Sequence, residues 1–210
     1  MAIEKLNKGE FLAFPGMTTN LQPQHVMASK FCKQFSIGGS TKRGKLGSRK
    51  KARTTAREFT TAEGKDHRNF VWVPWLPKGV NYGPTQGKDA LSGPFSGCYF
   101  VRYKIAGEGV WNAAHIATES DGLPDGREIW NDFVEANNVE ISSGFKPSPG
   151  PDRSDVNNVW VGLITNTDDL YRIEAGPTIA DTHPMLRKIL TVEKVESLPP
   201  DDLRNIQRAT

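Results

Sequence analysis

The chain has 210 residues, enough for one sizeable domain with appendages, and its formal net charge is +3 at pH 7. No run of about 18 apolar residues occurs, and the first residues lack the apolar stretch of a signal peptide. We therefore expect a soluble protein without a membrane span, cytoplasmic or delivered by non-classical secretion. Two cysteines, Cys32 and Cys98, are too few for a disulfide framework, so we expect free thiols.

The N-terminal part of the chain is basic. Residues 30 to 57 contain ten Lys or Arg residues and no acidic residue, with much Gly and Ser among them. Such a composition cannot bury enough apolar surface to offset the entropy lost on ordering. We predict a basic, mostly irregular arm over residues 1–60 and a β-rich domain with the candidate site over residues 61–210. The arm is compatible with a solvated linker or with attraction to an anionic partner, such as nucleic acid or a membrane surface.

Strand signals begin at residues 69–73, whose β-branched and aromatic side chains are followed by Pro74. Residues 78–94 are rich in Gly, Pro and Asn, which predicts a long loop. Residues 97–118 alternate apolar and polar side chains on both sides of Gly107, and this pattern predicts a β-hairpin that closes with a two-residue type II′ turn.

The second half of the chain is predicted to continue the sheets and to add helices. Residues 125–136 carry the apolar stripe of an amphipathic helix. Residues 139–141 predict a short strand and residues 142–151 a loop. The nearly all-apolar run at residues 159–164 predicts a central strand. Alternation predicts half-buried strands at residues 170–174 and 189–195, and a short polar helix is expected to start at Asp201.

The predicted hairpin brings a thiol and an imidazole together. With Gly107 and Glu108 as the loop, facing residues have numbers that sum to 215, so His115 faces Phe100. Cys98 and His115 then become diagonal neighbours on one face, roughly 7 Å apart at their backbones. A thiol is a nucleophile as thiolate, and an adjacent imidazole can take its proton and return one to a leaving group. The amides of Gly97 and Cys98 are candidate donors to an oxyanion.

The segment around this pair resembles a known family. Ser96-Gly97-Cys98, followed by a strand, a Gly-rich turn and a His on the return strand, resembles the catalytic hairpin of bacterial glutamine deamidases. That group includes the cytotoxic necrotizing factor toxins, Burkholderia lethal factor and the chemotaxis deamidase CheD. The segment from Trp72 to Trp75 looks like the Trp-x-Pro-Trp segment of the lethal factor, and Trp111 precedes the histidine as it does in that toxin.

The resemblance implies an α+β fold, with a β-sandwich-like core of mixed sheets and flanking helices. It implies a thiol-dependent glutamine deamidase, toxin-like or effector-like, that acts as a monomer on a protein substrate with a reactive glutamine. Cys98 would be the nucleophile and His115 the general base. The third group would be Ser92, six residues before the cysteine, or a backbone carbonyl. We expect substrate contacts from tryptophan side chains, namely Trp72, Trp75 and Trp111.

Two other interpretations stay open. The same pair could serve another cysteine hydrolase, a protease or an acyltransferase, because it attacks any carbonyl. Alternatively, the chain could be a protein-binding module in which Cys98 is simply buried. We expect no cofactor and no metal site, because the four histidines are scattered without ligand spacing. If His115 is not the base, His183 is the next candidate.

Overall fold

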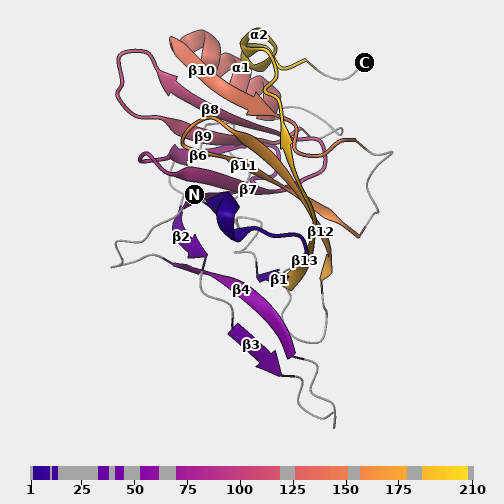
Figure 1. Cartoon of the computed structure of the whole chain (residues 1–210). Coiled ribbons are helices and arrows are strands. Elements are labelled where there is room, and N and C mark those ends of the chain that lie inside the picture. The colour runs from indigo at the N-terminus through magenta and orange to yellow at the C-terminus, as the bar shows by residue number, and fades with distance from the viewer. Residues whose placement is uncertain are drawn as a thin grey trace.

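The computed structural model describes residues 2–9, 11–13, 33–37, 41–44, 53–61, 70–118, 126–150, 157–178 and 186–207, with the backbone alone for residues 11–61. It is an α+β fold with two sheets and two α-helices, as the sequence predicted. The larger sheet is mixed, with strand order β1-β13-β12-β11-β7-β5-β2-β4-β3, and the smaller sheet is antiparallel, with order β10-β8-β9-β6. Figure 1 shows the two sheets and the helices beside the smaller one. The elements in chain order are η1 (Ala2–Lys5), β1 (Phe11–Ala13), β2 (Lys33–Ile37), β3 (Thr41–Gly44), β4 (Arg53–Thr61), β5 (Phe70–Pro74), β6 (Val80–Pro84), β7 (Asp89–Phe95), β8 (Tyr99–Ile105), β9 (Asn112–Ile116), α1 (Gly126–Ala136), β10 (Val139–Phe145), β11 (Val159–Ile164), β12 (Leu170–Thr178), β13 (Leu186–Val195) and α2 (Pro200–Arg204).

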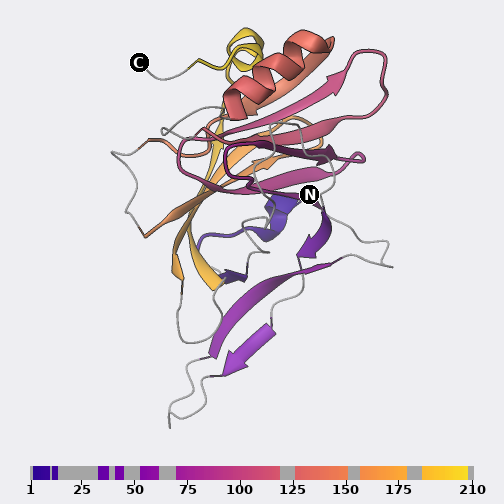
Figure 2. The ribbon, with the colours of Figure 1, turned by 180° about the vertical axis from the view of Figure 1, so that it is seen from behind.

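The smaller sheet is buried on both faces. One face packs against α1 and the segment around α2, which we call the helix-side core; Val101, Tyr103, Ile116 and Trp130 belong to it. The other face packs against the larger sheet in what we call the inter-sheet core, and the view from behind shows the same layers (Figure 2). The inter-sheet core consists of Val71, Val73, Ala90, Phe95, Cys98, Phe100, Ala113, Ala117, Phe145, Trp160, Ile164 and Leu170.

The hairpin of β8 and β9 has the predicted register. Tyr99 pairs with Ile116 and Phe100 with His115, so that facing numbers sum to 215. The predicted turn is wrong: Glu108 N donates to Ile105 O over 2.9 Å, and Gly107 takes the second central position with φ of +87°. Strand pairing stops at Tyr103 and Asn112. The loop is therefore longer than two residues, and Val110 within it is exposed.

Two segments predicted as loops are strands. Residues 78–94 contain β6 in the smaller sheet and β7 in the larger one, so this segment crosses from one layer to the other. Residues 142–144 extend β10 past a register shift between Ile141 and Ser143. In both cases glycine is tolerated inside a strand because a neighbouring strand or helix packs closely against it. A Cβ on Gly93 would lie 3.0 Å from Val161, and one on Gly144 would lie 2.8 Å from Leu203.

Other predicted elements agree with the structure. The predicted helix at 125–136 is α1, and its Ile129 and Trp130 are buried against the smaller sheet. The apolar run at 159–164 is β11, which lies between β12 and β7 inside the larger sheet. The strand signals at 69–73, 170–174 and 189–195 correspond to β5, β12 and β13, and the short helix at 201 is α2.

The N-terminal residues contribute more order than the predicted irregular arm. Leu6 is 3% exposed and packs in a third core cluster with Phe70, Trp72 and Ile189. Strand β1 pairs with β13, and β2 pairs with β5. Cys32, His25 and His67 lie outside the described residues. The division of the chain into domains at residue 60 stays a prediction.

Candidate functional site

Ser92 and His115 meet between the two sheets. Ser92 lies on β7 of the larger sheet and His115 on β9 of the smaller one, and both are fully buried. The Ser92 Oγ atom lies 2.6 Å from His115 Nδ1, and the Ser92 hydroxyl donates to Val73 O over 2.5 Å. The histidine of the predicted pair is therefore held by the residue predicted as its third group.

These two contacts fix the tautomer of His115. A backbone carbonyl can only accept a hydrogen bond, so the single proton of the Ser92 hydroxyl points to Val73 O. The Ser92 oxygen must then accept from Nδ1–H of His115. This leaves the lone pair on Nε2, and no described residue hydrogen-bonds that atom. His115 thus presents an unprotonated, unengaged nitrogen on the side of the ring away from Ser92.

Burial keeps the imidazole of His115 neutral. The ring is shielded from solvent, and this burial lowers the pKa of His115 from 6.5 to about 3. Phe95 stacks on it with ring centroids 4.1 Å apart and planes 7° apart. At neutral pH the ring is therefore uncharged, and Phe95 restricts its rotation.

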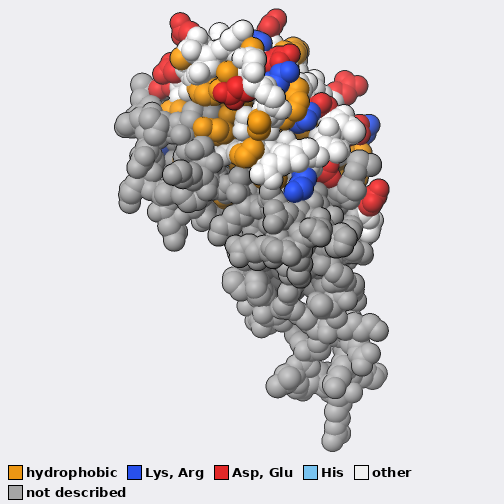
Figure 3. Space-filling view, turned by 90° about the vertical axis from the view of Figure 1, so that its left-hand side faces the viewer, with side chains coloured by type: hydrophobic (Ala, Val, Ile, Leu, Met, Phe, Trp, Pro, Cys, Tyr) orange, Lys and Arg blue, Asp and Glu red, His pale blue; other side chains and the backbone are white. Residues whose placement is uncertain are grey.

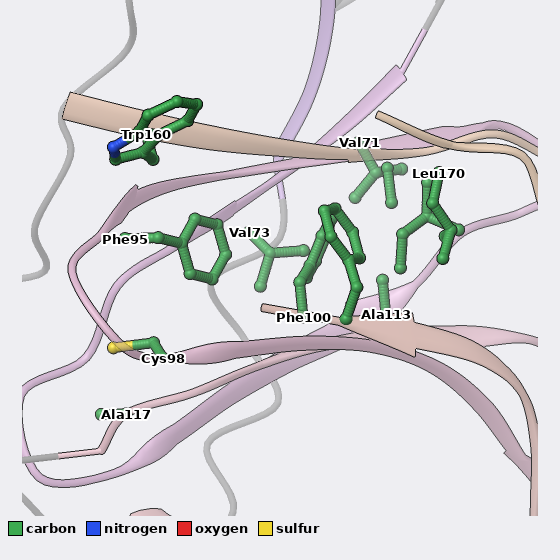
Figure 4. Close-up of a cluster of buried hydrophobic side chains, with 12 residues drawn as sticks. Val71, Val73, Phe95, Cys98, Phe100, Ala113, Ala117, Trp160 and Leu170 are labelled. Carbon is green, nitrogen blue, oxygen red and sulfur yellow. The ribbon is translucent and has the colours of Figure 1, made fainter. Parts of the chain in front are cut away.

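Cys98 lies on the same face of the smaller sheet as His115. Both residues face the inter-sheet core, and the register makes them diagonal neighbours, roughly 7–8 Å apart at their backbones. Cys98 is 5% exposed and lies beside Ala117 at one end of the core, as Figure 4 shows. The thiol does not hydrogen-bond Nε2 in this structure. Catalytic contacts without substrate are often long and tighten when substrate binds.

The predicted oxyanion donors lie just outside the strand ladder. Pairing between β8 and β9 ends at Tyr99 and Ile116, so Gly97 and Cys98 directly precede the paired residues. Ser96 is exposed and Gly97 is half-buried. A Cβ added to Gly97 would approach only Thr118 Oγ1, at 3.4 Å. The backbone before Cys98 is thus the part of the site that is nearest to solvent.

Asn81 is a site residue that the sequence analysis missed. It lies on β6 directly opposite His115 and is fully buried. Its Nδ2 donates to Pro74 O over 2.7 Å, and its Oδ1 has no partner among the described residues. The alternation of Val80, Asn81 and Tyr82 was a strand signal, but the surrounding Gly and Pro residues favoured a loop.

The three predicted substrate-binding tryptophans do not lie together. Trp75 is half-buried and packs on the inter-sheet core that contains Cys98. Trp72 faces the opposite side of β5, in the cluster with Leu6. Trp111 lies at the far end of the hairpin, under Arg102 and Lys104. Of the three, Trp75 is the one near the candidate site.

A second polar cluster lies at the other end of the hairpin. The Arg102 guanidinium contacts Asp168 Oδ2 at 2.7 Å, and Asp168 Oδ1 accepts from Ser142 and Ser143. Burial raises the pKa of Asp168, but the hydrogen bonds from Arg102 and the two serines, with the Arg102 charge, outweigh it and lower that pKa overall. Asp168 lies in the turn after β11 with φ of +66° and also neutralises Arg102.

The described surface and the comparisons add no other assignment. In the view of Figure 3 the described side chains mix hydrophobic, acidic and basic groups. No helix in the described part of the chain combines the length and the apolar character needed to cross a membrane. Comparisons with protein-family models, curated proteins and solved structures found no match to this chain.

Proposed function

We propose that this chain is a thiol-dependent glutamine deamidase that acts on a protein substrate, with Cys98 as nucleophile and His115 as general base. The observation that carries the proposal is the pair of hydrogen bonds from His115 to Ser92 and from Ser92 to Val73 O. They leave an unprotonated Nε2 on the same sheet face as a thiol. Ser92 then orients the base, the role that the resemblance to the deamidases implies for it.

The chemistry needs only these residues and water. Cys98 gives its proton to His115 Nε2 while its sulfur bonds to the carboxamide carbon of glutamine. His115 passes that proton to the nitrogen as the carbon–nitrogen bond breaks, and ammonia leaves. Water then attacks the thioester, with His115 taking its proton and returning it to the sulfur. The products are glutamate, ammonia and the free thiol.

Burial of the site favours a side-chain amide over a peptide bond as substrate. Cys98 is 5% exposed and His115 is shielded from solvent. A peptide bond carries chain on both sides and requires an open groove, whereas a glutamine carboxamide ends a slender apolar stem. Entry past Gly97, where the backbone is half-buried, suits such a stem.

The test is a mass measurement on candidate target proteins after incubation with the chain. We expect one glutamine to show the amide-to-acid change, and a high concentration of a primary amine to intercept the thioester as a transamidated product. The Cys98→Ser variant is the matched control and should give neither product. Cleaved target peptides would instead indicate a protease.

A binding module is the second candidate, and the near-complete burial of Cys98 favours it. The two functions differ in thiol reactivity. A catalytic Cys98 is alkylated faster than Cys32 near neutral pH, whereas a structural Cys98 resists alkylation. Peptide mapping after brief treatment with an alkylating reagent separates the two outcomes.

A further inference from the structure

We propose that Asn81 selects the carboxamide at this site, by accepting a hydrogen bond at Oδ1 from the NH2 group of the substrate side chain. This inference rests on the proposed function and names a specificity residue for it. It starts from the position of Asn81 directly opposite His115, on the face of β6 that points away from the helix-side core.

The orientation of the Asn81 amide is fixed by the backbone. Pro74 O can only accept, so the nitrogen of the side chain must be the atom that lies 2.7 Å from it. The oxygen therefore points away from Pro74. It is buried, and no described residue donates to it. Because buried acceptors are nearly always satisfied, this oxygen calls for a donor from water or from a ligand.

Asn81 and His115, which face each other across β6 and β9, thus each present a lone pair on the buried face of the sheet. Asn81 Oδ1 and His115 Nε2 both accept, and neither has a partner among the described residues. The Cys98 thiol can supply a proton to Nε2, and a carboxamide NH2 can supply one to Oδ1. An ester or a carboxylate brings only oxygen lone pairs at the same position, which leaves the asparagine oxygen unsatisfied.

The sheet leaves small residues between the three groups. Ala117 directly follows β9, donates its backbone N–H to Gly79 O just before β6, and is part of the inter-sheet core. Asn81 and Cys98 are two strands and two residues apart, roughly 12 Å at their backbones, from about 4.8 Å between strands and about 3.4 Å per residue. Both residues lie on the sheet face that is turned toward the inter-sheet core, and the proposed carboxamide would lie between them, beside Ala117.

The hydrogen bond would also help the leaving group. In the tetrahedral intermediate the nitrogen carries two hydrogens and a lone pair. With one N–H held by Asn81 Oδ1, the lone pair turns toward the protonated Nε2 of His115, which completes the transfer as ammonia forms. The glutamate product has no N–H and loses this contact, which promotes its release.

The experiment compares two neutral alkylating reagents that differ only in the group beside the carbonyl. In 2-chloroacetamide this group is NH2, and in methyl chloroacetate it is an ester oxygen. The rate of Cys98 alkylation by each, measured by peptide mass spectrometry, gives an amide-to-ester ratio that is normalised to a free cysteine peptide. In the wild-type protein we expect a ratio about tenfold above that of the free thiol, the factor of one hydrogen bond.

The variants locate the effect. Asn81→Ala should bring the ratio close to that of the free thiol, and Ser143→Ala, which removes a buried hydroxyl at the other end of the hairpin, should leave it unchanged. A wild-type ratio equal to that of the free thiol overturns the inference, even if Asn81→Ala does not fold. A raised ratio that Asn81→Ala does not change overturns it as well. In both cases Cys98 is still reactive and the deamidase proposal stands. A Cys98 inert to both reagents overturns the deamidase proposal and this inference with it.

Discussion

The two ends of the β8–β9 hairpin bury polar groups in opposite ways. At one end the Arg102 charge is paired, because Asp168 lies 2.7 Å away and two serines hydrogen-bond the same carboxylate. At the other end His115 gives up its charge, because burial lowers its pKa to about 3. A charge with its counter-ion holds layers together, whereas a neutral base with a free lone pair is available for chemistry.

The largest expected effect is at the His115 end. Cys98→Ser replaces the thiol by a nearly isosteric but far weaker nucleophile, so deamidation should fall by roughly 10⁴-fold. The free energy of unfolding should change by no more than about 1 kcal/mol, because the side-chain volume is nearly kept. Mass spectrometry of the products measures the loss of deamidation, and urea unfolding measures the change in stability. Turnover that survives the substitution would remove the thiol mechanism.

The Arg102 end should show the converse, a loss of stability without a loss of reactivity. Arg102→Met leaves Asp168 without its counter-ion, and we expect unfolding to become easier by about 3 kcal/mol, the lower end for a buried pair because Asp168 is 38% exposed. Urea unfolding measures this. Adding Asp168→Asn should recover part of the loss. A changed rate of Cys98 alkylation in Arg102→Met would mean that the two ends are coupled.

Ser92 should affect both stability and turnover. Ser92→Ala removes the acceptor for Nδ1–H of His115, which should destabilise the fold by about 1–3 kcal/mol. Turnover should fall by about 10- to 100-fold because the base loses its orientation, while Cys98 stays open to alkylation. Kinetics and alkylation rates on the same samples separate these effects. Unchanged turnover would point to a backbone carbonyl as the third group.

The pH dependence of stability should separate the two ends. His115 has a pKa near 6.5 when unfolded and about 3 when folded, so between these values the unfolded state binds the extra proton. The contribution of the neutral His115 to the free energy of unfolding is therefore fully present above pH 6.5. It falls by about 1.4 kcal/mol for each unit that the pH falls from 6.5 toward 3. The lowered pKa of Asp168 adds its own loss only below its ordinary value of 3.8. Urea unfolding at pH 7.0 and 5.5 should show the slope in the wild type and not in His115→Asn.

The sequence predicted the site where side-chain alternation is strong. The β8–β9 register follows from apolar residues at every second position, and the structure has the predicted pairing of His115 with Phe100. The contact between Ser92 and His115 joins two sheets, and periodicity within one strand carries no information on it. Ser92 was a candidate only through the resemblance to the deamidases.

Asn81 shows why another part of the candidate site was not predicted from the sequence. Residues 78–94 carry Gly, Pro and Asn, which ordinarily break strands. Here they form β6 and β7, because the neighbouring strand β11 leaves little room for a side chain at Gly93 and because Asn81 hydrogen-bonds Pro74 O. Local composition predicts a loop at such positions, because it carries no information on the tertiary packing that allows a glycine inside a strand. The buried asparagine therefore lies in a segment that the sequence predicted to be a loop.

The stacking of Phe95 on His115 has a spectroscopic consequence. With centroids 4.1 Å apart and planes 7° apart, the imidazole protons lie in the shielding cone of the phenyl ring. Their NMR signals should move upfield, away from those of the other three histidines of the chain. One resolved pair of resonances would then report ring motion and ligand entry at His115 in the unlabelled protein. A bound carboxamide that displaces Phe95 would return those signals toward their ordinary positions.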